Sequence, residues 1–164
     1  MPRRKLPPVF LPELELAGPP PAYRLALVRE PDAEPYLTGP SMSSPETVAS
    51  WLALKVWNEP AELLGFIALD TKLRPILHSI LYRGTTSRTA CEPAGILRAA
   101  LLCNASSIVI FHNHPSGDPA PSADDLAFTR RLAQACEVVG VRLVDHLILA
   151  GPGRYVSLRE RGAW

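Results

Sequence analysis

Two histidines, a serine and an aspartate fall within one segment of fourteen residues, 112 to 125, in an order that suits a metal ion. His112 and His114 follow Ser106 to Phe111, an apolar segment typical of a short buried strand. Because residues i and i+2 of a strand project to the same face, the two imidazoles can converge on one ion. Asp125 adds a carboxylate. Two imidazoles and one carboxylate suit zinc, and three protein ligands leave a coordination position open for water, as in catalytic sites.

The loop between the histidines and Asp125 contains prolines at positions 115, 119 and 121, and it ends at Ser122, where a helix is expected to begin. A serine N-cap followed by acids in the first turn satisfies free amides and suits the helix dipole. Taken singly, a His-x-His pair at a strand end is more often two surface or core histidines without a metal. Helix capping alone would explain Asp124 and Asp125. Their combination in this order favours a metal centre.

Hydrolysis at such a centre also needs a group that accepts a proton from water and passes it to the leaving group. Glu62 is the best-placed acid outside the motif, because it stands where a helix gives way to the apolar segment 63 to 69. Glu59 and Glu92 compete for the role, and an exposed loop glutamate is the plain alternative. The residues alone therefore leave the identity of the general base open.

The order Glu62, then His112-Asn113-His114-Pro115, then Ser122-Ala123-Asp124-Asp125 resembles the JAMM metalloprotease signature of JAB/MPN domains. Residues 23 to 158 look more closely like the RadC family, on the stretches Glu62 to Lys72, Arg83-Gly84-Thr85, His112 to Pro119 and Asp145-His146-Leu147-Ile148.

The resemblance implies a three-layer α/β/α sandwich with a mixed sheet, similar to cytidine deaminases. It also implies a zinc ion held by His112, His114 and Asp125, with Glu62 as general acid and base and Ser122 hydrogen-bonded to the developing oxyanion.

Two features depart from the RadC pattern. Leu64 and Gly65 stand where relatives usually carry bulkier residues, which bears on the strand register at Glu62. RadC proteins also commonly carry an N-terminal helical region with a DNA-binding helix-hairpin-helix, which the proline-rich segment here does not resemble. This second departure weakens a DNA role.

The expected organisation is a proline-rich N-terminal arm, residues 1 to 21 with seven prolines, followed by one domain over 22 to 164. Apolar periodicity and turn residues predict strands at 23–30, 63–69, 75–82, 106–111, 141–150 and 155–158. They predict helices at 45–57, with Ser44 as the cap, at 93–104 and at 123–139. In the second helix Ile96, Leu97, Ala100 and Leu101 are expected to face inward. Interleaved strands and helices predict a layered α/β domain in which helices cover a mixed sheet.

Composition argues against several classes of function and location. The 17 basic residues nearly balance the 16 acidic ones, which argues against strong non-specific binding to nucleic acid. The three cysteines, Cys91, Cys103 and Cys136, show no C-x-x-C spacing and suit a reduced, cytoplasmic setting. Neither a membrane span nor a signal peptide is recognisable, so no membrane partner is expected. A thiol at Cys103 in an apolar helix is expected to be inert.

These observations favour a zinc-dependent hydrolase that cleaves a peptide or isopeptide bond in a peptide or protein substrate; manganese or iron could occupy the same ligands. The alternative is a DNA repair or DNA-processing protein of RadC type, either a nuclease or a binder, although a nuclease would more naturally use magnesium or manganese with extra carboxylates. Deamination is disfavoured because the required His/Cys/Cys ligands are absent. Asp145 and His146 are candidates for orienting a metal ligand, but a satisfied core histidine is the favoured interpretation. The oligomeric state stays open.

Overall fold

The computed structural model describes residues 40–56, 59–84 and 92–164, so the expected arm at 1–21 and strand at 23–30 lie outside the described residues. Its elements are α2 (Pro45–Val56), β1 (Leu63–Leu69), β2 (Pro75–Arg83), α3 (Pro93–Leu102), β3 (Ser107–Asn113), α4 (Ala123–Val139), β4 (Arg142–Leu149) and β5 (Tyr155–Ser157). The predicted bounds of β1 and α4 are confirmed, and the other described elements agree to within one or two residues. No helix in the described part of the chain is long and apolar enough to cross a bilayer.

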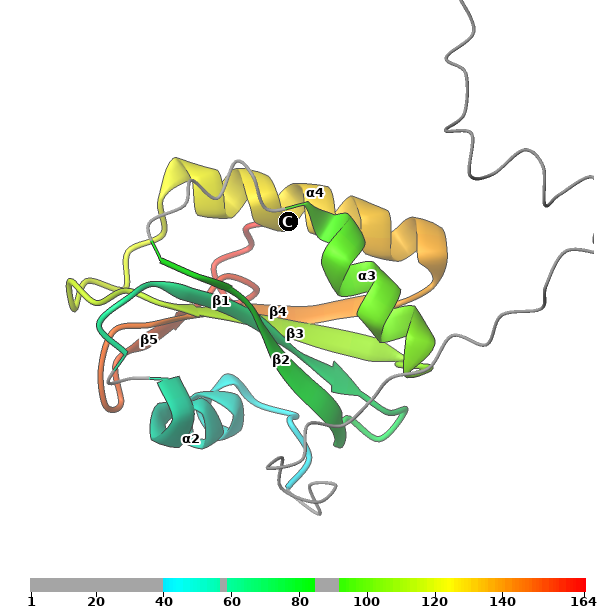
Figure 1. The fold of residues 1–164 in the computed structure, drawn as a ribbon, viewed down its shortest axis with the longest axis horizontal. Coiled ribbons are helices and arrows are strands. Elements are labelled where there is room, and N and C mark those ends of the chain that lie inside the picture. The colour runs from blue at the N-terminus through cyan, green and yellow to red at the C-terminus, as the bar shows by residue number, and fades with distance from the viewer. Residues whose placement is uncertain (1–39, 57–58, 85–91) are drawn as a thin grey trace, which may run out of the picture.

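The five strands form one mixed sheet in the order β2-β1-β3-β4-β5. The hairpin partners β1 and β2 are antiparallel, as are β1 and β3, whereas β3 and β4 are parallel and are joined by α4. Figure 1 shows α3 and α4 on one face of the sheet and α2 on the other. The expected α/β architecture with helices on both sides of a mixed sheet is therefore confirmed.

Two apolar clusters fill the spaces between the layers. Residues that alternate along β1 and β3, such as Phe66 and Ile110, pack toward α3 and α4. Their neighbours, such as Ile67 and Val109, pack toward α2. Since successive strand residues face opposite sides, the continuous apolar runs of β1 and β3 are what a sheet covered on both faces requires.

The helix α4 begins and ends where local sequence rules place its caps. Ser122 is the N-cap, and its hydroxyl accepts a hydrogen bond from the amide of Asp125 while the Asp125 carboxylate accepts one from the amide of Ser122. Gly140 closes the helix in the left-handed conformation at φ 72°, where a residue without a β-carbon is favoured. These caps fix where the first turn of α4 meets the sheet.

One inward-facing residue was predicted wrongly. Ile96, Leu97 and Ala100 of α3 are buried as expected, but Leu101 is 52% exposed. Leu101 lies about 100° around the helix from Ala100, at the margin of the apolar stripe. The apolar cluster beneath α3 includes Ile96, Leu97 and Ala100 but not Leu101.

Candidate metal centre

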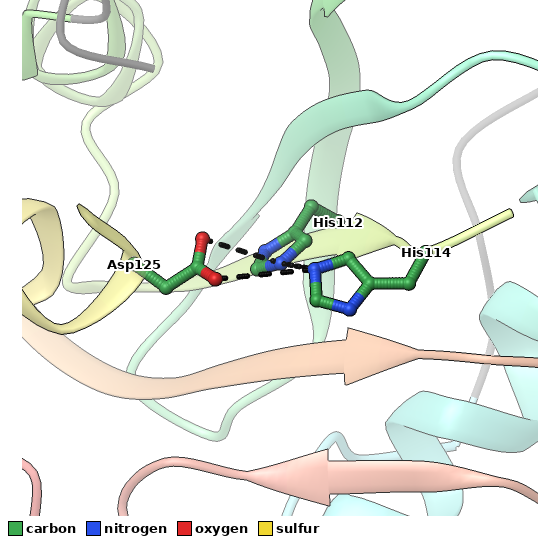
Figure 2. A group of neighbouring side chains, drawn as sticks. All are labelled: His112, His114 and Asp125. Carbon is green, nitrogen blue, oxygen red and sulfur yellow. Dashed lines mark hydrogen bonds and ion pairs between the residues drawn. The ribbon is translucent and has the colours of Figure 1, made fainter. Parts of the chain in front are cut away.

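Three side chains predicted to bind a metal converge at the end of β3 nearest the start of α4. Figure 2 shows the imidazoles of His112 and His114 turned toward the carboxylate of Asp125. The Nε2 atoms of the two histidines are 3.0 Å apart, and His112 Nε2 is 3.4 Å from Asp125 Oδ1. His114 Nε2 is 3.9 Å from Asp125 Oδ2. One ligand atom from each residue lies within 4.8 Å of the others, so the group could hold a metal ion.

Each of these side chains is positioned by its element. His112 is the sixth residue of β3 and is fully buried, whereas His114 follows the strand and keeps 11% of its side chain exposed. Asp125 is the third residue of α4 and is 1% exposed. Its Oδ2 accepts hydrogen bonds from the amide and the hydroxyl of Ser122 at 2.8 and 2.6 Å. Helix capping thus aims the carboxylate at the strand end.

The ring of His114 has its lone pair on the side of the site. His114 Nδ1 lies 2.6 Å from the carbonyl oxygen of Asp118. Because a carbonyl can only accept, Nδ1 carries the proton and the Nε2 of a neutral ring is left with a lone pair. That lone pair lies in the space between His112 and Asp125.

The spacing and chemistry of the donors fit a small first-row cation. Metal–nitrogen bonds of about 2.0–2.1 Å in a tetrahedron place neighbouring ligand atoms about 3.3 Å apart. The separations of 3.0 Å between the two Nε2 atoms and 3.4 Å from His112 to Asp125 lie close to that length, and the 3.9 Å from His114 to Asp125 is longer. A cation in this space would satisfy both the lone pair of His114 and the buried carboxylate of Asp125.

Glu62 immediately precedes β1, and its carboxylate is not among the three converging donors. The register nevertheless brings its backbone close to the histidines, because Leu64 of β1 pairs with His112 of β3. Glu62 lies two residues before Leu64, so its backbone is near the strand end that carries the histidines.

Asn113, the residue between the two histidines, holds the segment that carries Glu62. Its Oδ1 accepts a hydrogen bond from the amide of Leu63 at 2.7 Å, and its Nδ2 donates to the carbonyls of Glu59 and Ala61 at 3.2 and 3.1 Å. Asn113 is 2% exposed, so water does not compete for these bonds. This role was not predicted, because it depends on which strand lies beside β3.

Two further polar residues lie behind His112: His146, which the sequence offered as the less favoured candidate for orienting a ligand, and Thr129, which the sequence did not single out. His146 of β4 places its Nε2 2.8 Å from His112 Nδ1, and its Nδ1 is 2.6 Å from the hydroxyl of Thr129 on α4. The carboxylate of its neighbour Asp145 accepts hydrogen bonds from the backbone amide of His146, from the hydroxyl of Ser157 and from the amide of Arg159. Of the two residues considered for orienting a metal ligand, only His146 contacts a candidate ligand directly. The side chain of Asp145 connects β4 to β5 and to the segment that follows β5.

Comparison with known proteins identifies the family and agrees with the fold. A family model described as a RadC-like JAB domain matches residues 42–163. A UPF0758 protein of Halorhodospira halophila is 41% identical over 138 residues, which cover 84% of this chain and 61% of that protein. A UPF0758 protein of Thermotoga maritima is 48% identical over 101 residues, covering 62% of this chain and 45% of that protein. The chain thus spans about half to three fifths of the length of these relatives. With a family match over most of its length, the chain belongs to the RadC-like JAB domain family.

Proposed function

We propose that this chain is a metal-dependent hydrolase of the JAMM type that cleaves a peptide or isopeptide bond. The observation that carries the proposal is the convergence of His112, His114 and Asp125 from β3 and α4 on one small volume. Three protein donors with two imidazoles and one carboxylate are typical of catalytic zinc sites, whereas structural zinc sites usually use four. Zinc is therefore the proposed ion, with manganese or iron as substitutes.

The proposed chemistry divides between the ion and the chain. When bound, the cation supplies Lewis acidity, which polarises a carbonyl and makes water nucleophilic at neutral pH. His112 and His114 contribute neutral donors, and Asp125 contributes the negative charge that balances the cation. The rigidity of the donors comes from β3 and from the capped first turn of α4.

Glu62 is proposed to move the proton. Its carboxylate accepts a proton from water and donates it to the leaving amine, the usual work of a general base that then acts as general acid. The strand register and the hydrogen bonds of Asn113 support this assignment, since they fix the backbone on both sides of Glu62 relative to the histidines. The amide of Gly84 adds a bond to the carbonyl of Glu62 at 2.9 Å.

Ser122 is proposed to stabilise the oxyanion that develops on the substrate. Its hydroxyl lies 2.6 Å from Asp125 Oδ2, so it is adjacent to the candidate cation site. For this role the hydroxyl would turn its hydrogen from Asp125 Oδ2 to a substrate oxygen, and Oδ2 would keep its bond from the amide of Ser122. A single donor of this kind contributes about 2.7–4 kcal/mol to transition-state stabilisation.

The test compares hydrolysis by the zinc-loaded protein across peptide, isopeptide-linked and duplex or single-stranded DNA substrates. We expect cleavage of an amide bond and none of DNA. Glu62→Gln should bind zinc as the wild type does and lose turnover by about 100-fold or more. Glu137→Gln, an exposed change on α4, serves as the matched control.

Two results would contradict the proposal: turnover unaffected by Glu62→Gln, or zinc-dependent cleavage of DNA with every amide substrate left intact. The second would favour the DNA-processing alternative. The near balance of basic and acidic residues argues against that alternative, because phosphate binding relies on several lysines and arginines.

A further inference from the structure

A chain of short, buried polar contacts runs from α4 through β4 to the candidate ligand His112. The hydroxyl of Thr129 donates to the carbonyl of Asp125 at 2.6 Å and also contacts His146 Nδ1 at 2.6 Å. His146 Nε2 in turn lies 2.8 Å from His112 Nδ1. All four residues are at most 1% exposed, so these contacts are made without competition from solvent.

The single hydroxyl proton of Thr129 determines where the other protons lie. Because Thr129 donates that proton to the Asp125 carbonyl, its oxygen can only accept from His146, and His146 Nδ1 must carry a proton. A neutral His146 then has an unprotonated Nε2, which accepts a hydrogen bond from the Nδ1–H of His112. A neutral His112 that is protonated at Nδ1 is unprotonated at Nε2, and this Nε2 is the atom that faces His114 and Asp125.

A register shift in β4 is what brings His146 to this position. β4 pairs with β3 through Leu143 and then through Asp145, so Val144 is an extra residue. Leu143 packs toward α3 and α4, and strict alternation would turn Asp145 to that side. The extra residue turns His146 there instead, beside its partner Ile110 and under α4. Bulges of this kind commonly re-aim a side chain next to a functional site.

We propose that His146 and Thr129 are positioning residues that hold His112 in the one tautomer able to bind a cation, an inference that rests on the metal-dependent function proposed above. In this proposal His146 is not a metal ligand, and it acts on the site only through its hydrogen bond to His112. Thr129 acts one step further back, and its bond to the Asp125 carbonyl couples the same chain to the helix that carries the third ligand. Removing such an outer partner typically weakens metal affinity by about 10- to 100-fold.

The test measures zinc affinity by calorimetry and histidine tautomers by ¹⁵N NMR of the metal-free protein, neither of which needs a substrate. In the wild type, His112 should be the Nδ1-protonated tautomer. Thr129→Val keeps the shape of the side chain and removes its hydroxyl, so zinc affinity should fall by about tenfold or more. Thr129→Ser restores the hydroxyl and should restore affinity. His146→Gln should weaken binding similarly, whereas His78→Gln, on the exposed side of β2, should not.

Several outcomes would overturn the inference: His112 protonated at Nε2 in the wild type, wild-type affinity in both Thr129→Val and His146→Gln, or equal loss in Thr129→Val and Thr129→Ser. Thermal unfolding of the metal-free variants identifies any that fail to fold, and the Thr129 pair retains the test if His146→Gln does. A wild type that binds zinc but hydrolyses nothing contradicts the proposed function alone. A wild type that binds no zinc contradicts both proposals.

Discussion

The side-chain oxygen of Asn113 accepts a hydrogen bond at 2.7 Å from the backbone amide of Leu63, fifty residues away in the chain. The amino group of the same side chain bonds the carbonyls of Glu59 and Ala61. One buried amide therefore fixes the segment on both sides of Glu62 and does so from the position between the two histidines. The residue proposed to transfer the proton and the candidate cation ligands are therefore positioned through the same side chain.

Asn113→Asp should separate these two functions. The substitution keeps an oxygen for Leu63 but replaces the two donated bonds with a carboxylate facing carbonyl oxygens. We expect the free energy of unfolding to fall by about 1–3 kcal/mol and kcat/KM of the zinc-loaded protein to fall by about 10- to 100-fold, because Glu62 loses its fixed position. Zinc affinity should change less than threefold. Asn104→Asp, at an exposed left-handed turn, is the control, and a large loss of zinc affinity in Asn113→Asp would argue against the separation.

Asp125→Asn should remove cation binding while α4 keeps its start. The amide oxygen can still accept from Ser122, so only the charge at the helix N-terminus is lost, worth about 0.3–1 kcal/mol. Zinc affinity should fall by more than about 100-fold, beyond the effect typical of outer partners. The melting temperature of the wild type should rise when zinc is added and fall back to the metal-free value when a chelator removes the zinc. The melting temperature of Asp125→Asn should change with neither treatment. Asp124→Asn, the exposed neighbour, should behave as the wild type; equal zinc responses in the two variants would refute a ligand role for Asp125.

Gly65→Ala should destabilise the sheet next to the site. A β-carbon at Gly65 would lie 2.4 Å from the ring of Phe111 and 2.6 Å from the carbonyl oxygen of Ser79. We expect a loss of about 1–3 kcal/mol in urea unfolding. Gly95→Ala, in α3 with open space around it, should instead stabilise by about 0.5–1 kcal/mol. The absence of a side chain at position 65, a departure from the RadC pattern, is thus explained by the ring that fills its place, and unchanged stability would contradict that explanation.

Cys136 should make stability depend on alkaline pH. Burial raises the pKa of its thiol to about 11 from a usual value of 9.0. The folded state therefore favours the protonated thiol, so this contribution is fully present below pH 9 and is lost as the pH rises through 11. Urea unfolding of the wild type should weaken between those values more steeply than that of Cys136→Ala, which removes the titrating group. Parallel pH profiles for the two proteins would show that the thiol contributes nothing.

The elements that sequence predicted best are those defined by local signals. Ser122 and Gly140 bracket α4, and the cap also accounts for the direction of the Asp125 carboxylate. The spacing of His112 and His114 on a strand end sufficed to predict their convergence. Burial raises the pKa of Cys103, in agreement with the inert thiol expected there.

What sequence did not predict depends on pairing between distant segments. The hydrogen bonds of Asn113 depend on β1 lying beside β3. The sequence favoured a satisfied core histidine at position 146, and strict alternation from Leu143 would turn His146 away from α4. One extra residue, Val144, reverses that alternation, and no local pattern in the sequence marks it. The misplaced Leu101 has a similar origin, since periodicity alone does not show where a helix loses its neighbours.

Asp125 is both a candidate metal ligand and part of the N-terminal cap of α4. This combination limits how the candidate metal centre could be transferred to another protein. A graft of residues 112–125 onto another scaffold would transfer all three donors, yet the aspartate would point correctly only if a helix started at the same place. It would also lack Thr129 and His146, which lie outside the grafted segment. Transplanting the centre would therefore require the strand, the helix and the following strand together, as one indivisible βαβ unit.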